Sequence, residues 1–280
     1  MSAIAFPLVE LLGIQDAAAL LREAVSRRAV DRTQTKYRTK LRRVLWRMWR
    51  QQRNTVTNSW LPLMQARGIL REASTGVDGL IQLLAGLLAV DESSWGDELA
   101  AVLTEVVMIA ARDAIADLRL GASFDIPTAR IEREIRQHAG QLVSGLNLTT
   151  REELRSILER AVAERMTYAQ AARLLRNRFT EFGALVPLHH IHDRAELIAV
   201  TEIGQAYVRG QQQIGNALQA AGVSMEKAWL TAQDERVEPE CESNGAAGWI
   251  PWDESFPSGH DAPLAHPGCR CALQMERSAE

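Results

Sequence analysis

Apolar residues recur at intervals of three and four positions through most of the first 220 residues, which places them on single faces of α-helices. Prolines, glycines and other turn formers interrupt the pattern and divide it into separate segments. The predicted helices cover residues 9–29, 32–58, 77–90, 98–120 and 126–144, a pair of short helices within 149–179, and one that begins near residue 193. This part of the chain is therefore expected to be a multi-helix assembly.

Three local signals predict where helices start or stop. Thr149 or Thr150, followed by two glutamates, has the form of a capping box and predicts a new helix start. Thr167 and Gln170 form the same pattern for the next helix. Pro62 predicts a break or a start near the preceding residues, because proline lacks a backbone donor.

The pattern changes after Gly222, where turn formers, prolines and tryptophans replace helical spacing. One or two short β-hairpins are predicted there, with Trp229, Trp249 and Trp252 as their small core. A unit of about 50 residues buries too little surface to be stable alone, so a metal staple would solve a physical problem.

These patterns predict a mainly α fold class. Multi-helix N-terminal and central regions are expected to precede a small C-terminal α+β module stapled by a metal. The predicted divisions are residues 1–139, residues 140–222 and residues 223–280.

All three cysteines lie in the last forty residues, as Cys241, Cys269 and Cys271. Residues two apart in a strand point to the same side, so the last two can aim their sulfurs at one point. Together with His266, they form a complete set of four ligands for structural zinc. Asp234 and His260 are alternative ligands. The other interpretation is three ordinary cysteines, one of them free.

The residues around this cluster resemble a known family. The chain reads Trp-Leu-Thr-Ala-Gln-Asp-Glu-Arg over 229–236 and His-Pro-Gly-Cys-Arg-Cys over 266–271, and upstream it reads Arg-Ala-Glu-Leu-Ile-Ala-Val-Thr-Glu over 194–202. In this order the segments resemble the phage head morphogenesis proteins, the Mu F-like minor head proteins, over residues 140–275. Gly268 replaces the family's usual Asn, and Val200 stands where the family often has a basic residue.

The resemblance implies a minor head protein of a tailed phage or prophage, made in the host cytoplasm and located in the procapsid or virion head. Its implied partners are the portal protein and the capsid or scaffold, with packaged double-stranded DNA as a further candidate. No membrane and no small-molecule substrate are expected.

Charge is distributed unevenly along an otherwise ordinary composition of 46% hydrophobic and 24% charged residues. Eleven Lys or Arg residues and no Asp or Glu lie in the segment from Arg32 to Arg71. The formal net charge of the whole chain is −3, so the residues outside this segment carry −3 minus 11, or −14. On a helical wheel, cations oppose an apolar stripe, with Trp46 and Trp49 between them as predicted packing residues. The predicted contact residues for DNA or the portal are Arg32, Lys36, Arg43, Arg47 and Arg50. A solvated helix face is the alternative.

An enzyme is not predicted, because no set of catalytic roles can be filled. Glu202 lies in an apolar helix and, if buried, needs a partner such as an arginine or a backbone donor from the C-terminal module; Arg236 is one candidate. Residues 189–192 contain three histidines, which are interpreted as part of a solvated loop. The alternatives are a phage-delivered, toxin-like or metal-dependent hydrolase and a zinc-stabilised cellular adaptor.

Overall fold

The computed structural model describes residues 14–66, 75–118, 128–181 and 194–278. Its elements are helix α2 (Ile14–Thr55), π-helix η1 (Val56–Trp60), α3 (Leu61–Ala66), α4 (Thr75–Ala89), α5 (Glu92–Asp117), α6 (Thr128–Ala163), α7 (Tyr168–Glu181), α8 (Arg194–Ala220), strand β1 (Met225–Leu230), α9 (Pro239–Ala246), β2 (Trp249–Pro251) and β3 (Ala272–Arg277). The mainly α fold with a small C-terminal α+β unit is confirmed.

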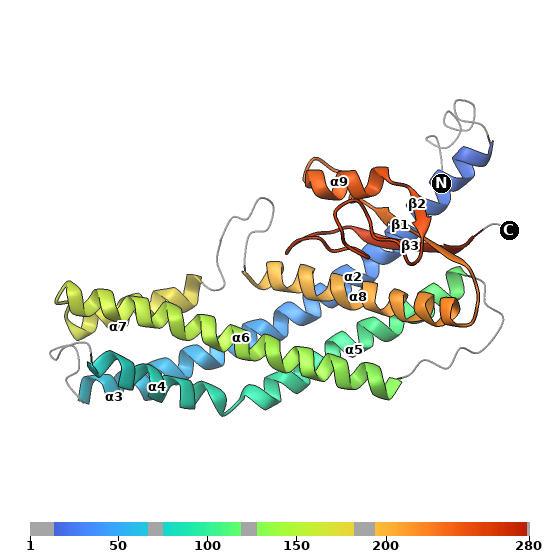
Figure 1. Ribbon diagram of the computed structural model, residues 1–280. Coiled ribbons are helices and arrows are strands. Elements are labelled where there is room, and N and C mark those ends of the chain that lie inside the picture. The colour runs from blue at the N-terminus through green and yellow to red at the C-terminus, as the bar shows by residue number, and fades with distance from the viewer. Residues whose placement is uncertain (1–13, 67–74, 119–127, 182–193, 279–280) are drawn as a thin grey trace.

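Helices α2 to α8 form an elongated bundle, and residues 223–278 form a C-terminal module that lies against α8 near one end of it (Figure 1). The three strands of the module are antiparallel in the order β2-β1-β3. Trp229 of β1 pairs with Leu273 of β3, and Ala228 pairs with Trp249 of β2. Because β1 is the central strand, it is buried along nearly its whole length.

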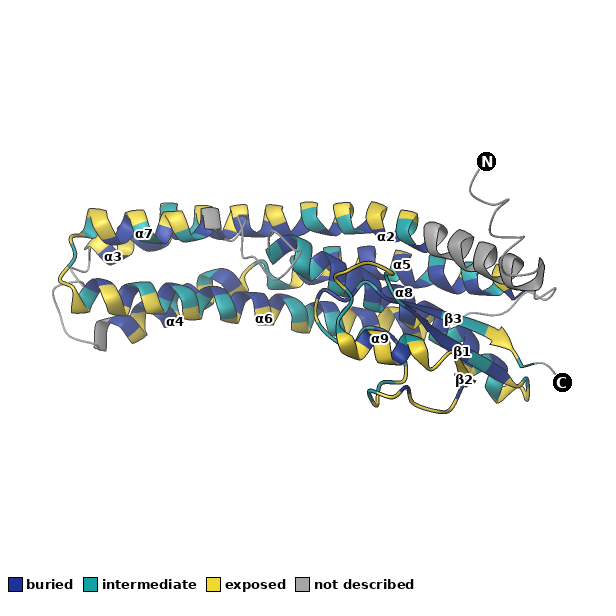
Figure 2. Ribbon diagram, turned by 90° about the horizontal axis from the view of Figure 1, so that it is seen from above, coloured by how far each residue is buried: buried dark blue, intermediate teal, exposed yellow. Residues whose placement is uncertain are grey.

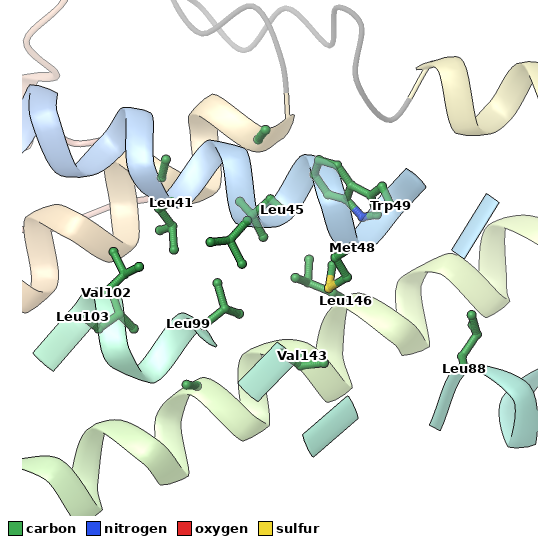
Figure 3. Packing of buried hydrophobic residues seen from close by; sticks show 14 of the residues in the cluster. Leu41, Leu45, Met48, Trp49, Leu88, Leu99, Val102, Leu103, Val143 and Leu146 are labelled. Carbon is green, nitrogen blue, oxygen red and sulfur yellow. The ribbon is translucent and has the colours of Figure 1, made fainter. Parts of the chain in front are cut away.

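The bundle core is built from apolar side chains of helices that are distant in sequence. Leu41, Leu45 and Met48 of α2 point toward residues of α5 and α6, including Leu99 and Val143 (Figure 3). Full burial of each such side chain is worth about 1.5–3 kcal/mol of transfer free energy. The apolar stripe predicted on this helix is thus the face that holds the bundle together. Trp49 is buried as predicted, whereas Trp46 is 39% exposed and is not a core residue.

Helix α6 corrects the predicted break near residue 149, because it runs without interruption from Thr128 to Ala163. The hydroxyl of Thr149 donates to the carbonyl of Gly145, and that of Thr150 donates to Leu146. Threonine side chains inside a helix commonly bond back to the preceding turn in this way, so the same residues serve a helix interior instead of a cap.

The boundary signal at Thr167 is confirmed, and the one at Pro62 coincides with a change of helix type. The Thr167 backbone N–H donates to Gln170 Oε1 at 2.8 Å, and the Gln170 N–H donates to Thr167 Oγ1 at 3.3 Å, which is a reciprocal capping box. Helix α3 begins at Leu61, next to Pro62, but Thr55 and Leu61 on either side of η1 are both in the αR conformation, so this boundary is a change from π-helix to α-helix within a continuous helical path. The predicted domain divisions stay predictions; α6 spans the first of them and α8 ends just before the second.

The module's core differs from the predicted trio of tryptophans. Trp229 packs edge-on against Phe256 with ring centroids 5.2 Å apart, and both join the buried cysteines in one cluster. Trp252 belongs to a second cluster with residues of α8. Trp249 is 42% exposed because it lies on β2 at the edge of the sheet, so its inclusion in the core was wrong.

Glycines allow α8 to approach its neighbours closely. A Cβ on Gly210 would lie 2.4 Å from the carbonyl oxygen of Val107 in α5, and one on Gly215 would lie 2.2 Å from the Trp252 ring. Any larger residue would therefore push the helix away from the bundle or from the module. None of the described helices combines the length and apolar character that crossing a bilayer requires.

Candidate metal centre

Helix α9 and the segment before β3 bring the three cysteines together. Cys241 lies in the first turn of α9, which Pro239 starts and Glu240 supports through the helix dipole. Cys269 and Cys271 directly precede β3, after a turn in which Gly268 has a φ of 79°. Glycine adopts that left-handed conformation without strain, so Gly268 suits this turn.

The sulfur atoms of the three cysteines lie close together in the buried interior of the module. All lie within 4.8 Å of each other, and Cys241 Sγ is 3.7 Å from Cys269 Sγ. Each cysteine is at most 3% exposed. This separation is far beyond the ~2.05 Å of a disulfide bond, and the cysteines are free thiols. The cluster therefore has the donor set and spacing of a site that can hold a metal ion.

Electrostatics within the cluster also favours a cation. Hydrogen bonds from Cys241 and Cys269 hold the pKa of the Cys271 thiol far below its usual range. Hydrogen bonds with Cys269 and Cys271, reinforced by burial, raise the pKa of the Cys241 thiol. If two or three of these buried thiols lost their protons, the like charges would repel one another, and a cation between the sulfurs would be needed to stabilise them.

The Nε2 atom of His266, rather than its Nδ1, faces Cys241. Its Nε2 lies 3.6 Å from Cys241 Sγ, and its Nδ1 lies 3.1 Å from the carbonyl oxygen of Pro267. An N–H donated to that carbonyl places the proton on Nδ1 and leaves the Nε2 lone pair free. Metal-binding histidines are commonly oriented by a carbonyl in this manner.

The two alternative ligands make other contacts. Asp234 accepts two hydrogen bonds from Arg270, at 2.8 and 2.7 Å, and this guanidinium holds the pKa of the carboxyl at about 2. His260 Nδ1 lies 2.9 Å from Ser258 Oγ and 3.5 Å from a Glu240 oxygen. Within the described ranges, the potential metal-binding group comprises the three cysteines alone.

The loop that carries the cysteines is fixed to α8. The Gly268 N–H donates to Thr201 Oγ1 at 2.9 Å, and that hydroxyl donates to the Leu197 carbonyl at 2.8 Å. Two further bonds join α8 to the module, from Gln211 to the Leu273 carbonyl and from the Trp252 indole to Asn216. Thr201, in the Thr-Glu pair of the sequence pattern, thus positions the turn that holds Cys269.

The second residue of that pair, Glu202, faces the helical bundle. His138 of α6 lies 2.6 Å from its carboxylate, beside a cavity of about 10 Å³ that Gln205 and Arg209 help to line. Arg236, the expected partner, is exposed, and its backbone N–H donates to Asp234. Glu202 therefore links α8 to α6, and within the described residues no hydrogen bond or ion pair joins it to the three cysteines.

The predicted contact residues all lie on the exposed side of α2: Arg32, Lys36, Arg43, Arg47 and Arg50. Arg47 differs from the others because its guanidinium lies 2.5 Å from a carboxylate oxygen of Glu98. The three histidines at 189–192 fall outside the described residues.

Two buried polar residues were missed by the sequence analysis. Asn244 is fully buried, and its side chain holds Ser258 through two hydrogen bonds. Lys227 is 3% exposed, donates to the Asp261 carbonyl and lies over the rings of Trp252 and Phe256; burial lowers its pKa. A lysine in a short strand normally signals an exposed face, and nothing in the sequence around Asn244 of α9 distinguishes it from an exposed helix residue, so neither had a usable signal.

Comparison with known proteins gives one match. A family described as Phage Mu protein F like protein matches residues 128–274, which is more than half of the chain. No curated protein and no solved structure matches. The matched region runs from the start of α6 through the cysteine cluster into β3, so it contains the three hydrogen bonds described above between α8 and the module. The chain belongs to the Phage Mu protein F like family.

Proposed function

We propose that this protein is a minor head protein of a tailed phage or prophage that associates with the portal during procapsid assembly. Family membership indicates a role in phage head morphogenesis, and the match over residues 128–274 is the observation that carries the proposal. The portal, the capsid or scaffold, and packaged DNA are its proposed partners. The procapsid or virion head is its proposed location.

In this proposal the C-terminal module is a rigid docking unit. Its cysteine turn, its strand β3 and its Trp252 are each tied to α8 by a hydrogen bond or close packing. A unit fixed at several points transmits the position of its partner to the whole bundle instead of rotating freely.

Co-expression with portal, scaffold and capsid proteins tests this function. The wild-type chain should purify with procapsids and be retained by immobilised portal protein. Thr201→Val removes the hydroxyl that binds the cysteine turn and should reduce retention, whereas the exposed Thr39→Val should not. Absence of the wild-type chain from both procapsids and portal would contradict the proposal.

We propose zinc as the metal, held by Cys241, His266, Cys269 and Cys271. Zinc–ligand lengths of about 2.3 Å to sulfur and about 2.05 Å to nitrogen, at tetrahedral angles, separate ligand atoms by about 3.8 and about 3.6 Å. The Cys241–Cys269 sulfur separation of 3.7 Å and the Cys241–His266 sulfur–nitrogen distance of 3.6 Å match these values. His266 lies outside the group of ligand atoms that are all within 4.8 Å of one another, so a metal ion would have to draw its ring toward the other two sulfurs. Soft thiolates with one imidazole are also the donor set that zinc prefers.

Four protein ligands leave no open coordination position, so the proposed metal stabilises the fold and activates no water. This supports a structural protein over a hydrolase. Metal analysis tests the site: wild type should retain zinc, and each single Cys→Ser variant should lose most of it. His266→Ala should weaken zinc binding, while the control His260→Ala should not. Equal zinc content in all variants would overturn the ligand set.

A further inference from the structure

The exposed side of α2 divides into two classes of cation. Lys40, Arg42 and Arg47 bind carboxylates of α5 and α8, with nitrogen–oxygen distances of 2.5, 2.9 and 2.5 Å. These ion pairs attach α2 to its neighbours. The remaining exposed cations, which we call the outward set, are Arg32, Lys36, Arg43, Arg50 and Arg53. In the described part of the chain, no ion pair joins the outward set to a carboxylate.

The outward set is arranged in two parallel rows. Lys36, Arg43 and Arg50 repeat every seven residues, or about 10.5 Å along a helix. A neighbouring row repeats at the same interval and consists of Arg32, Thr39, Trp46 and Arg53. All seven side chains are exposed, and they extend over about 30 Å of helix. Figure 2 shows this exposed side of α2 along the outer edge of the bundle.

The composition of these rows favours a polyanion over a folded protein partner. Protein interfaces are usually built around an apolar core, but Trp46 is the one large apolar side chain in the two rows. Four of the five cations are arginines, whose planar guanidinium groups bind phosphate oxygens in pairs. No Asp or Glu occurs between residues 32 and 71, and the carboxylates that reach α2 from α5 and α8 are paired with Lys40, Arg42 and Arg47.

We propose that the outward set binds the phosphate backbone of double-stranded DNA. The length of the rows is close to the ~34 Å of one duplex turn, over which phosphates of both strands come within reach. The chain outside residues 32–71 carries −14 and repels DNA, so this charge asymmetry orients the bundle with α2 toward the duplex. The inference rests on the proposed function only for its biological setting, in which packaged DNA is the abundant polyanion.

Salt-dependent binding tests the proposal with a duplex of about 30 base pairs and mixed sequence, followed by fluorescence anisotropy. Five phosphate contacts predict a slope of about −4 to −5 for log K against log salt. Arg43→Gln with Arg50→Gln should reduce the magnitude of that slope by about 2 and should weaken binding to all sequences alike. Zinc content and melting temperature should not change, because both side chains are exposed.

The matched control removes two exposed arginines elsewhere, through Arg133→Gln on α6 and Arg173→Gln on α7. It changes net charge equally and should leave the slope near the wild-type value. Equal loss in both double variants would show general electrostatics and overturn the proposal. No binding of the wild-type chain at about 50 mM salt would also overturn it.

Portal retention of the same variants separates this inference from the proposed function. The outward double variant should still bind the portal while losing DNA. Loss of portal binding with an unchanged DNA slope would assign the face to a protein partner and sink the DNA proposal. If the wild-type chain binds DNA but is absent from procapsids, the proposed function fails and the DNA face stands.

Discussion

The helical bundle and the C-terminal module achieve stability by different physical means. The bundle buries a long series of aliphatic and aromatic side chains from α2 to α8 in one continuous cluster. The module's own cluster holds five buried residues, of which three are the cysteines, with Trp229 and Phe256 beside them. A small unit cannot bury enough apolar surface, so sulfur ligands and polar clamps replace hydrophobic area there. The comparison predicts that the two regions respond to different perturbations.

Metal removal should give the largest effect and should act on the module alone. Structural zinc contributes an apparent ~10–16 kcal/mol to the folding of small zinc units. Treatment with a strong chelator should therefore abolish amide protection in β1 and β3 while far-UV circular dichroism retains most of the helical signal. Hydrogen exchange resolved by region measures both. Unchanged protection in β1 and β3 without metal would break the comparison.

Truncation of the bundle core should give the opposite pattern. Leu45 is fully buried, so Leu45→Ala should lower the free energy of unfolding of the bundle by about 2–5 kcal/mol. Urea denaturation followed by helical signal measures the loss, and zinc content should stay at the wild-type value. Thr39→Ala on the exposed side of the same helix should change stability by less than about 0.5 kcal/mol.

A pair of glycine substitutions should separate packing from helix propensity. Gly210→Ala adds a methyl group 2.4 Å from the Val107 carbonyl oxygen and should destabilise the protein by about 1–3 kcal/mol. Gly145→Ala in α6 meets no atom within 4 Å and should stabilise it by about 0.5–1 kcal/mol. Thermal unfolding of the two variants compares them directly, and shifts of the same sign would contradict the close packing of α8 on α5.

The smallest expected effect concerns alkaline pH. Burial, with a hydrogen bond to Glu105, raises the pKa of Tyr37 from 10.0 to about 12. Because the folded state holds this proton more tightly, the contribution is complete below about pH 10 and is lost as pH rises through about 12. Tyr37→Phe should flatten the fall in melting temperature between those values. The same fall in wild type and variant would assign alkaline unfolding to other groups.

The sequence predicted the mainly α fold and the cysteine cluster because both depend on short-range patterns. Helical spacing on α2 identified Leu41, Leu45 and Met48 correctly, and thiol clustering pointed to Cys241, Cys269 and Cys271. The candidate metal ligands other than the cysteines, which are His266, His260 and Asp234, all lie close to the cysteines along the chain, so sequence alone could identify them as candidates. The structure brings His266 to the cluster and engages Asp234 with Arg270.

Contacts between distant segments could not be predicted in the same way. His138 and Glu202 are 64 positions apart, and neither local periodicity nor charge marks them as a pair. Helix α6 runs continuously through Thr149, whose hydroxyl bonds backward within the helix, although the same residues match a capping pattern in the sequence. Trp249 was misplaced because strand order, not hydrophobicity, decides which strand is at the edge.

The bonds from α8 to the module have a practical consequence for anyone dividing this chain into fragments. A piece that starts at residue 223 would leave the faces of Trp252 and Leu273 bare and would lose the Thr201 hydroxyl that steadies the cysteine turn. Such a fragment should be prone to aggregation and poorly soluble even when zinc is supplied. A workable minimal fragment has to begin at or before Arg194, so that the helix travels with the domain it supports.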